Sequence, residues 1–207
     1  MKIVLATKNQ DKVKEIKQLL KDIAVEVFTL DHFPEIDEII EDGVTLEQNA
    51  IKKAKTVFHR TGLIAVADDT GLEVDALAGK PGVFSSRFAG EDATYEDNVR
   101  KLLQQMEGIS QSKRGARFRC VISIVGPGIA QSVDGVCSGM ITRQKRGVAG
   151  FGYDPVFWVA EYGQTFAEMP LELKNRISHR GLALQKAKKV LQQLAANQQQ
   201  DISYQRR

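Results

Sequence analysis

The chain has 207 residues, of which 43% are hydrophobic and 27% charged, the balance of a globular protein that can bury a full core. Its 29 basic and 26 acidic side chains give a net charge of +3, too small for the concentrated basic surface of a general nucleic-acid binder. No stretch approaches a membrane-spanning length, and the N-terminus lacks the apolar run of a signal peptide. We therefore expect a cytoplasmic protein with no membrane partner and no stable nucleic-acid partner.

Strand and helix patterns alternate at the start of the chain. Residues 2–6 predict a buried strand, and apolar residues at a spacing of 3.6 between Val13 and Ile23 predict a helix. A second strand is expected at 25–28. The acidic segment 29–43 has no clear periodicity and is predicted to be a loop.

The next segment repeats this order. Thr45 is expected to begin a helix that ends at Gly62, and a strand follows at 63–67. That strand runs directly into Asp68-Asp69-Thr70-Gly71. After a glycine-containing connection at 76–93, Thr94 is expected to cap a helix over about 95–106.

A late hairpin is predicted from strand patterns near 116–125 and 130–142, joined at Gly126-Pro127-Gly128. Cys120 and Cys137 lie in these strands, and in a cytosolic chain two reduced, partly buried thiols are favoured over a disulfide. The three histidines are scattered, so no zinc site is indicated.

The end of the chain contains an apolar run at 156–159 and a last helix that Ser178 opens. The whole order is mixed α/β, and we expect one domain over residues 1–196 followed by a frayed polar tail at 197–207.

The first candidate site is the junction between the first strand and the first helix. Such a junction exposes free backbone N–H groups and the positive end of the helix to an anion. The segment supplies neutral donors and two lysines, and it lacks the glycine-rich pattern of a Walker loop. The alternative is an ordinary helix cap with solvated lysines. The residues concerned are Thr7, Lys8, Asn9, Gln10, Asp11 and Lys12.

The second candidate is acidic. Asp68 and Asp69 end a buried strand, where successive side chains point to opposite faces, so only one can face a given site. Glu41 offers another carboxylate from the predicted loop. Carboxylates of this kind suit Mg²⁺, which also binds waters and substrate phosphates. The alternative is a turn cap at Asp68 and a solvated Glu41.

The third candidate is the segment Gly150-Phe151-Gly152-Tyr153-Asp154-Pro155. Its glycines permit unusual backbone conformations, and the loop can bring N–H groups and a flat ring to a small planar ligand. The alternative is a glycine-rich turn with two rings in the core.

A fourth cluster combines Lys174 with Ser178-His179-Arg180. Ser178 is a plausible N-cap, which places His179 and Arg180 in the first helical turn, where cations oppose the helix dipole. Cations in that position are consistent with an anion or a hydrogen-bond acceptor nearby. An exposed polar first turn is the alternative.

Together these motifs resemble the inosine/xanthosine triphosphate pyrophosphatases, from Met1 to about Leu194. The resemblance rests on motifs that follow one another in the family's order: Ala6-Thr7-Lys8-Asn9-x-x-Lys12, Glu41-Asp42-Gly43, Asn49-Ala50-x-x-Lys53-Ala54, Ala67-Asp68-Asp69-Thr70-Gly71-Leu72, the segment Pro81–Gly90, Gly150–Pro155 and Ser178-His179-Arg180-Gly181.

The resemblance implies a fold, a reaction and a set of roles. The fold is a long mixed sheet flanked by helices in two lobes, with the nucleotide in the cleft between them, and the protein is a homodimer. The reaction is Mg²⁺-dependent hydrolysis of a purine nucleoside triphosphate to the monophosphate and pyrophosphate. Asp69 is the implied general base, and Glu41 and Asp69 hold the metal. The implied substrate contacts are Thr7 through Lys12, Thr70, Phe151, Gly152, Tyr153, Asp154, Lys174, His179 and Arg180.

Two positions depart from the family pattern: Asp11 replaces a smaller residue, and Lys145-Arg146 replaces a proline before the aromatic loop. Three alternative functions have less support from the sequence. A Maf-type pyrophosphatase lacks support because its arginine-rich N-terminal loop is absent. A regulator that binds nucleotide without hydrolysis would not need both Asp69 and Glu41. A nucleic-acid binder is disfavoured by the modest charge.

Overall fold

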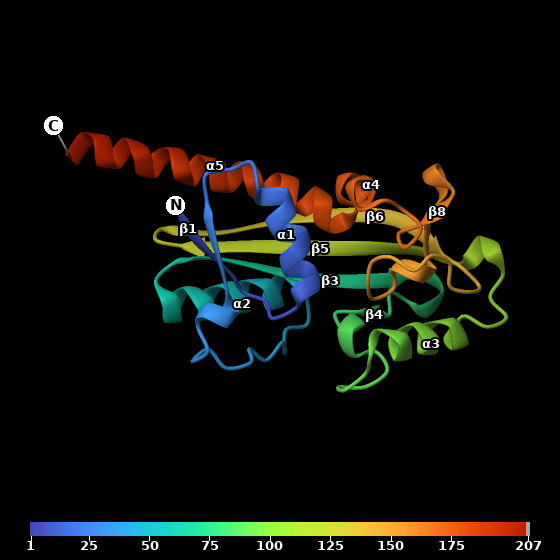
Figure 1. Ribbon diagram of the computed structural model, residues 1–207. Helices are drawn as coiled ribbons and strands as arrows, with labels where there is room; N and C mark the ends of the chain where they lie inside the picture. The colour runs from blue at the N-terminus through green and yellow to red at the C-terminus, as the bar shows by residue number, and fades with distance from the viewer. Residues whose placement is uncertain (206–207) are drawn as a thin grey trace. The chain divides into compact units, whose positions relative to one another are not determined.

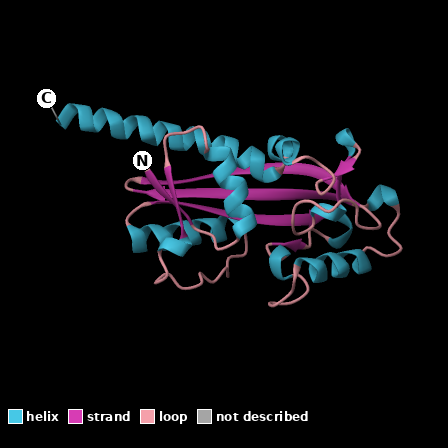
Figure 2. Cartoon of the chain, viewed as in Figure 1, coloured by secondary structure: helices cyan, strands magenta, loops and turns pink. Residues whose placement is uncertain are grey.

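The computed structural model describes residues 1–205, and side chains as far as residue 197 (Figures 1 and 2). The chain forms two compact units. Unit 1 comprises Met1–Asp69, Val121–Asp134 and Leu182–Arg207, and unit 2 comprises Thr70–Cys120 and Gly135–Gly181.

The helices and strands follow the mixed order expected from the sequence (Figure 2). The α-helices are α1 (Gln10–Leu20), α2 (Leu46–Thr61), α3 (Tyr95–Gln105), α4 (Leu171–Ile177) and α5 (His179–Gln205). The strands are β1 (Lys2–Leu5), β2 (Glu26–Thr29), β3 (Ile64–Val74), β4 (Pro81–Gly82), β5 (Gly115–Gly126), β6 (Ile129–Ile141), β7 (Phe157–Val159) and β8 (Gln164–Thr165). Their hydrogen-bonded order is β2-β1-β3-β5-β6-β7-β8, with β4 paired to β3.

Parallel pairing dominates the N-terminal part of unit 1. β1 pairs in parallel with β2 and β3, with Val4 opposite both Phe28 and Ala65. Parallel neighbours need long crossover connections, which α1 and α2 provide. Buried apolar side chains from these elements, including Val4, Ala54 and Val57, form the core of the unit. The carboxyl ends of β1 and of the first part of β3 therefore reach the same edge of the sheet.

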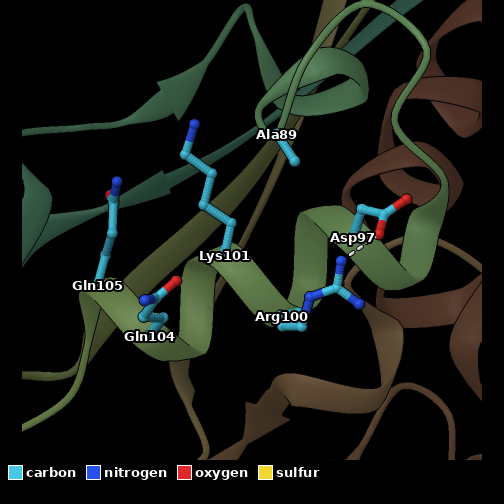
Figure 3. A pocket seen from close by; sticks show the side chains of 6 residues that line it. All are labelled: Ala89, Asp97, Arg100, Lys101, Gln104 and Gln105. Atoms are coloured by element: carbon cyan, nitrogen blue, oxygen red, sulfur yellow. Dashed lines mark hydrogen bonds and ion pairs between the residues drawn. The ribbon is translucent and has the colours of Figure 1, made fainter.

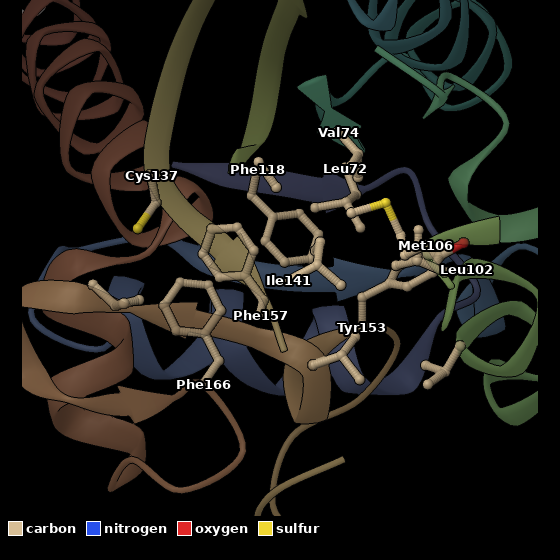
Figure 4. Close-up of a cluster of buried hydrophobic side chains, with 14 of the residues drawn as sticks. Leu72, Val74, Leu102, Met106, Phe118, Cys137, Ile141, Tyr153, Phe157 and Phe166 are labelled. Atoms are coloured by element: carbon tan, nitrogen blue, oxygen red, sulfur yellow. The ribbon is translucent and has the colours of Figure 1, made fainter. Parts of the chain in front are cut away.

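Unit 2 is built around aromatic side chains. β3 pairs antiparallel with β4, and β7 pairs antiparallel with β6 and with β8. Figure 4 shows the rings of Phe118, Phe157 and Phe166 gathered beside Ile141. Centroids of the Phe118 and Phe157 rings lie 4.7 Å apart, and those of Phe157 and Phe166 lie 4.9 Å apart. With the parallel pairs in unit 1, these pairings make the sheet mixed, as expected.

The capping predictions are confirmed. Thr45 Oγ1 accepts from the N–H of Gln48, and Gly62 ends α2 in the left-handed region at φ 67°. Thr94 caps α3 with a capping box in which Asp97 participates. Ser178 Oγ accepts from the N–H of Gly181, so His179 and Arg180 lie in the first turn of α5, as predicted.

Two regions differ from the sequence prediction or extend it. The helix α4 was not predicted, because seven residues after Pro170 are too few to show a clear period. α5 continues to Gln205. Fraying of the tail from residue 197, and the single domain over 1–196, stay predictions, and residues 206–207 lie outside the described part of the chain.

Both cysteines are free, as predicted, and both are buried, where partial burial was expected. Burial raises the pKa of the Cys137 thiol to about 11, with a smaller contribution from Glu161, so the reactive thiolate is scarce at neutral pH. None of the helices within residues 1–205 is both long enough and apolar enough to cross a membrane.

A buried arginine holds the end of β6 in unit 2. Arg114 is 2% exposed, and its guanidinium donates to three backbone carbonyls. The distances are 2.7 Å to the oxygen of Ile141, 2.7 Å to that of Met106 and 2.8 Å to that of Thr142. This side chain therefore joins the end of α3 to the point where the chain leaves β6 for the aromatic loop.

Replacement of Arg114 by Met should lower the free energy of unfolding by about 2–4 kcal/mol, because buried carbonyls then lose their donors. Urea unfolding measures this change. Arg117→Met is the control: that side chain is exposed and pairs with Glu73, so its loss should matter little. Equal stability of the two variants would contradict the role assigned to Arg114.

Candidate active site

The first cluster of polar residues forms in unit 1, at the sheet edge where β1 and the first part of β3 end. Lys12, in the first turn of α1, lies 3.1 Å from Asp68 Oδ2, and the Asp68 side chain is 1% exposed. The Asp69 side chain points to the opposite face of the strand, toward α2, as the alternation of strand side chains predicts. The Asp68 carboxylate thus pairs with Lys12, whereas the Asp69 carboxylate contacts Asn49 and Lys53.

Asp69 is held by α2. Asn49 Nδ2 donates to Asp69 Oδ2 at 3.2 Å, and Lys53 Nζ lies 3.4 Å from Asp69 Oδ1. Asn49 and Lys53 are one helical turn apart, so they project from the same face of α2. Asn49 Oδ1 also accepts from the N–H of Gly43 at 2.7 Å, which fixes the loop that carries Glu41. A Cβ at Gly43 would lie 2.5 Å from that oxygen, so glycine is required there.

Lys53 is the centre of this cluster. Its Nζ donates to Glu41 Oε1 at 2.7 Å and to the backbone oxygen of Asp68 at 2.7 Å, in addition to its contact with Asp69. Burial alone would lower the pKa of Lys53, but the carboxylates of Asp69, Glu41 and Asp68 raise it above its ordinary value. The side chain is therefore a charged ammonium that holds two carboxylates close together.

The pKa of Asp69 lies above its ordinary value. Burial raises it and Glu41 adds to the rise, while Lys53 and Lys12 oppose it. An ionised carboxylate with a raised pKa is a stronger proton acceptor than an exposed one.

The donor set fits a hard divalent cation only in part. Glu41 and Asp69 supply carboxylate oxygens within reach of one ammonium, and oxygen donors are those that Mg²⁺ prefers. No group of three or more His, Cys, Asp or Glu side chains arranged to hold a metal occurs among the residues that the structure describes. Waters and substrate phosphates would have to complete the shell.

The loop after β1 combines a helix cap with an array of donors. Asn9 is the N-cap of α1, and its Oδ1 accepts from the N–H groups of Asp11 and Lys12. The N–H of Asn9 donates to Thr7 Oγ1 at 3.2 Å, and Gln10 Nε2 donates to Asp31 at 3.4 Å. The alternative reading as a cap is thus correct for Asn9. Lys8 is exposed at the same helix end, which leaves a positive group available to an anion.

The second cluster forms in unit 2 around Asp154. Its Oδ2 accepts from the N–H of Phe151 at 2.9 Å and from Lys174 Nζ at 2.6 Å. The side chains of Asp154 and Lys174 are 4% and 5% exposed. Gly150 has a φ of 74°, and a Cβ there would lie 2.1 Å from the same Asp154 oxygen. The glycine therefore allows the carboxylate to close the loop.

The ring of Phe151 lies beneath two cations. Lys174 Nζ is 5.0 Å from the ring centroid, and the guanidinium carbon of Arg180 is 5.4 Å from it. Arg180 Nη2 also donates to Thr70 Oγ1 at 3.3 Å. The structure thus brings together five residues that the sequence analysis proposed as substrate contacts, from β3, the aromatic loop, α4 and α5: Thr70, Phe151, Asp154, Lys174 and Arg180.

Two other predicted contact residues have clear packing roles. The Tyr153 side chain belongs to the aromatic core, and its hydroxyl donates to the Ser85 oxygen at 2.9 Å. Burial raises the pKa of Tyr153 above its ordinary value. The His179 ring stacks on Phe118, with centroids 4.4 Å apart and planes 13° apart. Their substrate contacts stay predictions.

Sequence reasoning gave no role to Asn49, Lys53 or Ser85, although each is in a motif noted above. For Asn49 and Lys53 the available signal was their spacing: they are polar residues at positions i and i+4 on the apolar face of a predicted helix. A polar residue on that face becomes buried when the helix packs, as both are in α2. Ser85 carried no such signal. Its Oγ accepts from the N–H of Leu72 at 2.8 Å and donates to the Gly82 oxygen at 2.6 Å.

A hollow of about 540 Å³ along α3 is a separate feature, lined by Ala89, Asp97, Arg100, Lys101, Gln104 and Gln105 (Figure 3). It includes no predicted site residue. Its cations are already engaged, since Arg100 pairs with Asp97 and Lys101 Nζ donates to the Phe88 oxygen at 2.6 Å. The hollow therefore supports no binding role.

Residues 3–190 match the model of the Ham1 family, so the chain belongs to that family. It is 52% identical over 200 residues to the dITP/XTP pyrophosphatase of Desulforamulus reducens, covering 96% of this chain and 100% of that one. It is also 52% identical over 187 residues to the dITP/XTP pyrophosphatase of Desulfotalea psychrophila, covering 90% of this chain and 83% of that protein. A solved HAM1 protein from Coxiella burnetii has a TM-score of 0.86 and 41% identity, covering 93% of this chain and 99% of that one.

Replacement of Lys53 by Met should lower the free energy of unfolding by about 3 kcal/mol when divalent cations are absent, because two carboxylates lose their shared counter-charge. Mg²⁺ should then raise the melting temperature of the variant more than that of the unmodified protein, since a bound cation would replace the lost charge. Thermal unfolding with and without Mg²⁺ measures both effects.

The neighbouring Lys52 provides the control. It pairs with the exposed Asp42 at 2.7 Å, so Lys52→Met should change neither stability nor the response to Mg²⁺. A Lys53 variant that behaves like the Lys52 variant would show that Lys53 is not the counter-charge.

Proposed function

We propose that this protein hydrolyses the non-standard purine nucleoside triphosphates ITP, dITP and XTP to the monophosphate and pyrophosphate. This reaction would remove damaged purines from the nucleotide pool before they enter DNA and RNA. The observation that carries the proposal is the cluster of Asp69 on β3, Glu41 on the loop before α2 and Lys53 on α2. Asp69 and Lys53 are buried in it, and Glu41 is partly exposed. Membership of the Ham1 family and relatives named dITP/XTP pyrophosphatase support it.

The loop at 7–12 is proposed to bind the triphosphate. The N-terminus of α1 is the positive end of the helix, and Lys8 and Lys12 add positive charge there, while Asn9 Oδ1 already accepts from the N–H groups of Asp11 and Lys12. Lys12 lies near Asp68, which orients its ammonium at the sheet edge. Asp11 adds a negative charge at the same turn but is exposed, so solvent screens it.

Asp69 is proposed to take the proton from the attacking water as the anhydride bond between the α- and β-phosphates breaks. Its raised pKa suits this step, and Asn49 and Lys53 fix the orientation of the carboxylate. Glu41 and Asp69 would hold Mg²⁺, which when bound offsets phosphate charge and stabilises the departing pyrophosphate. Lys53 would have to shift from its position between these carboxylates for both to contact the metal.

The second cluster is proposed to bind the purine. Phe151, the less buried ring of the loop, would stack on the base, since Tyr153 is 5% exposed and belongs to the core. Arg180 and backbone N–H groups would donate to the oxygen at purine position 6. Arg180 cannot act as an acceptor, so an adenine amino group would face only donors. Lys174 and Asp154 would keep the loop closed.

The finer parts of the proposal are Mg²⁺ dependence, a homodimer and a cytoplasmic location, and the homodimer rests on the family resemblance alone. Sedimentation of the purified protein measures its assembly state. Measurement of pyrophosphate released from inosine triphosphate, with and without Mg²⁺, tests the reaction. Nucleotide binding without release would favour a regulator instead.

Asp69→Asn should abolish pyrophosphate release while the melting temperature stays close to that of the unmodified protein, because the amide keeps the shape but loses the base. Glu41→Gln is the comparison: turnover should persist at a higher Mg²⁺ concentration, since one ligand weakens and the base remains. Substantial turnover by the Asp69 variant would overturn its role, and an unaltered Mg²⁺ titration would exclude Glu41 as a ligand.

Arg180→Ala should lower kcat/KM for inosine triphosphate about tenfold or more relative to adenosine triphosphate, because the donor that favours a 6-oxygen is lost. Steady-state kinetics with both nucleotides measures the ratio. Arg176→Ala, at an exposed position of α4, is the control and should leave the ratio unchanged. Equal losses for both nucleotides would show that Arg180 serves the phosphates or the fold.

A further inference from the structure

The orientation of the Phe151 ring depends on what packs against it. Gly150 and Gly152 on either side have φ values of 74° and 61°, so no regular helix or strand fixes the residue. Lys174 and Arg180 lie over the ring, but Lys174 is paired with Asp154 and Arg180 is proposed to contact the nucleotide. A neighbour outside these groups would hold the ring independently of the nucleotide.

Tyr95 is such a neighbour. Its ring centroid lies 5.7 Å from that of Phe151, with the planes tilted by 38°, a geometry in which aromatic pairs attract. Tyr95 is the first residue of α3 and is 42% exposed. No motif of the sequence analysis included it.

The first turn of α3 is itself firmly anchored. Thr94 Oγ1 accepts from the N–H of Asp97, and Asp97 Oδ2 accepts from the N–H of Thr94, which fixes where the helix starts. One turn further on, Asn98 is 2% exposed and bonds to the N–H of Ala89 and the oxygen of Ser86. These bonds fix the first turn of α3, and the position of that turn sets where the Tyr95 side chain leaves the helix.

A second contact joins the same turn to the aromatic loop. Glu96, next to Tyr95, accepts from Lys145 Nζ at 2.7 and 2.8 Å. Lys145 is one of the two residues that depart from the family pattern before the loop. The next residue, Arg146, is held by a backbone hydrogen bond, in which its N–H donates to the Pro155 oxygen at 2.8 Å. The first turn of α3 therefore contacts the loop at its entry and at Phe151.

We propose that Tyr95 is a positioning residue for the purine-stacking ring of Phe151, with the Glu96–Lys145 pair supporting the entry of the loop. This inference rests on the proposed function of the second cluster. Tyr95 acts through Phe151 and contributes to binding of the base, whereas the bond-breaking step uses Asp69. Its loss should therefore change KM and leave kcat close to its original value.

Tyr95→Ala should raise KM for inosine triphosphate about three- to tenfold, the range expected for loss of an aromatic pair. Tyr95→Phe should retain the original KM, because the ring makes the contact. Val148→Ala, at a fully exposed position of the same loop, is the control and should change nothing. Melting temperatures of all variants show whether each is folded at the assay temperature.

A double-mutant cycle with Phe151→Ala separates positioning from a general effect on stability. If Tyr95 acts through Phe151, adding Tyr95→Ala to Phe151→Ala should raise KM no further. Additive effects, or an unchanged KM in Tyr95→Ala, would overturn the inference. If Phe151→Ala itself left KM unchanged, the proposed base site would fail, and the two failures are thereby distinguished.

Discussion

The ammonium group of Lys53 is the interaction on which the acidic cluster depends. Two carboxylates and a backbone carbonyl converge on one buried nitrogen, and without it the negative charges would repel each other in a poorly solvated place. At the proposed Mg²⁺ site, the ammonium of Lys53 and the metal would compete for the same carboxylate oxygens. Lys53 would therefore have to shift before both carboxylates could contact the ion.

The aromatic loop of unit 2 uses the same device with the signs arranged differently. Asp154 is buried with Lys174, and its Oδ2 also accepts from the backbone of Phe151, so one carboxylate closes the loop and fixes a lysine over the ring. Gly150 is needed because any side chain would occupy the space of that carboxylate. In this loop the buried ion pair of Asp154 and Lys174 fixes a backbone conformation. The pair has no proposed part in proton transfer, unlike Asp69.

Much of this could be predicted from local sequence rules. Caps at Thr45, Thr94 and Ser178 follow from hydroxyl side chains that satisfy free N–H groups, and each was identified in the sequence. The opposite orientation of Asp68 and Asp69 follows from the two-residue period of a strand. These features depend on neighbours within a few positions, so the sequence contains the information directly.

Contacts between residues far apart in the sequence could not be predicted. Nothing local shows that Lys53 reaches Glu41, that Tyr153 bonds to Ser85, or that Tyr95 packs on Phe151, because each pair is brought together by strand order and helix packing. The motif Asp68-Asp69-Thr70-Gly71 is an example of what local sequence does not reveal. The boundary between the two units falls between Asp69 and Thr70, so one short run of sequence supplies the acidic cluster with Asp69 and the aromatic cluster with Thr70. A single strand therefore carries the proposed general base at Asp69 and a proposed substrate contact at Thr70, the next residue.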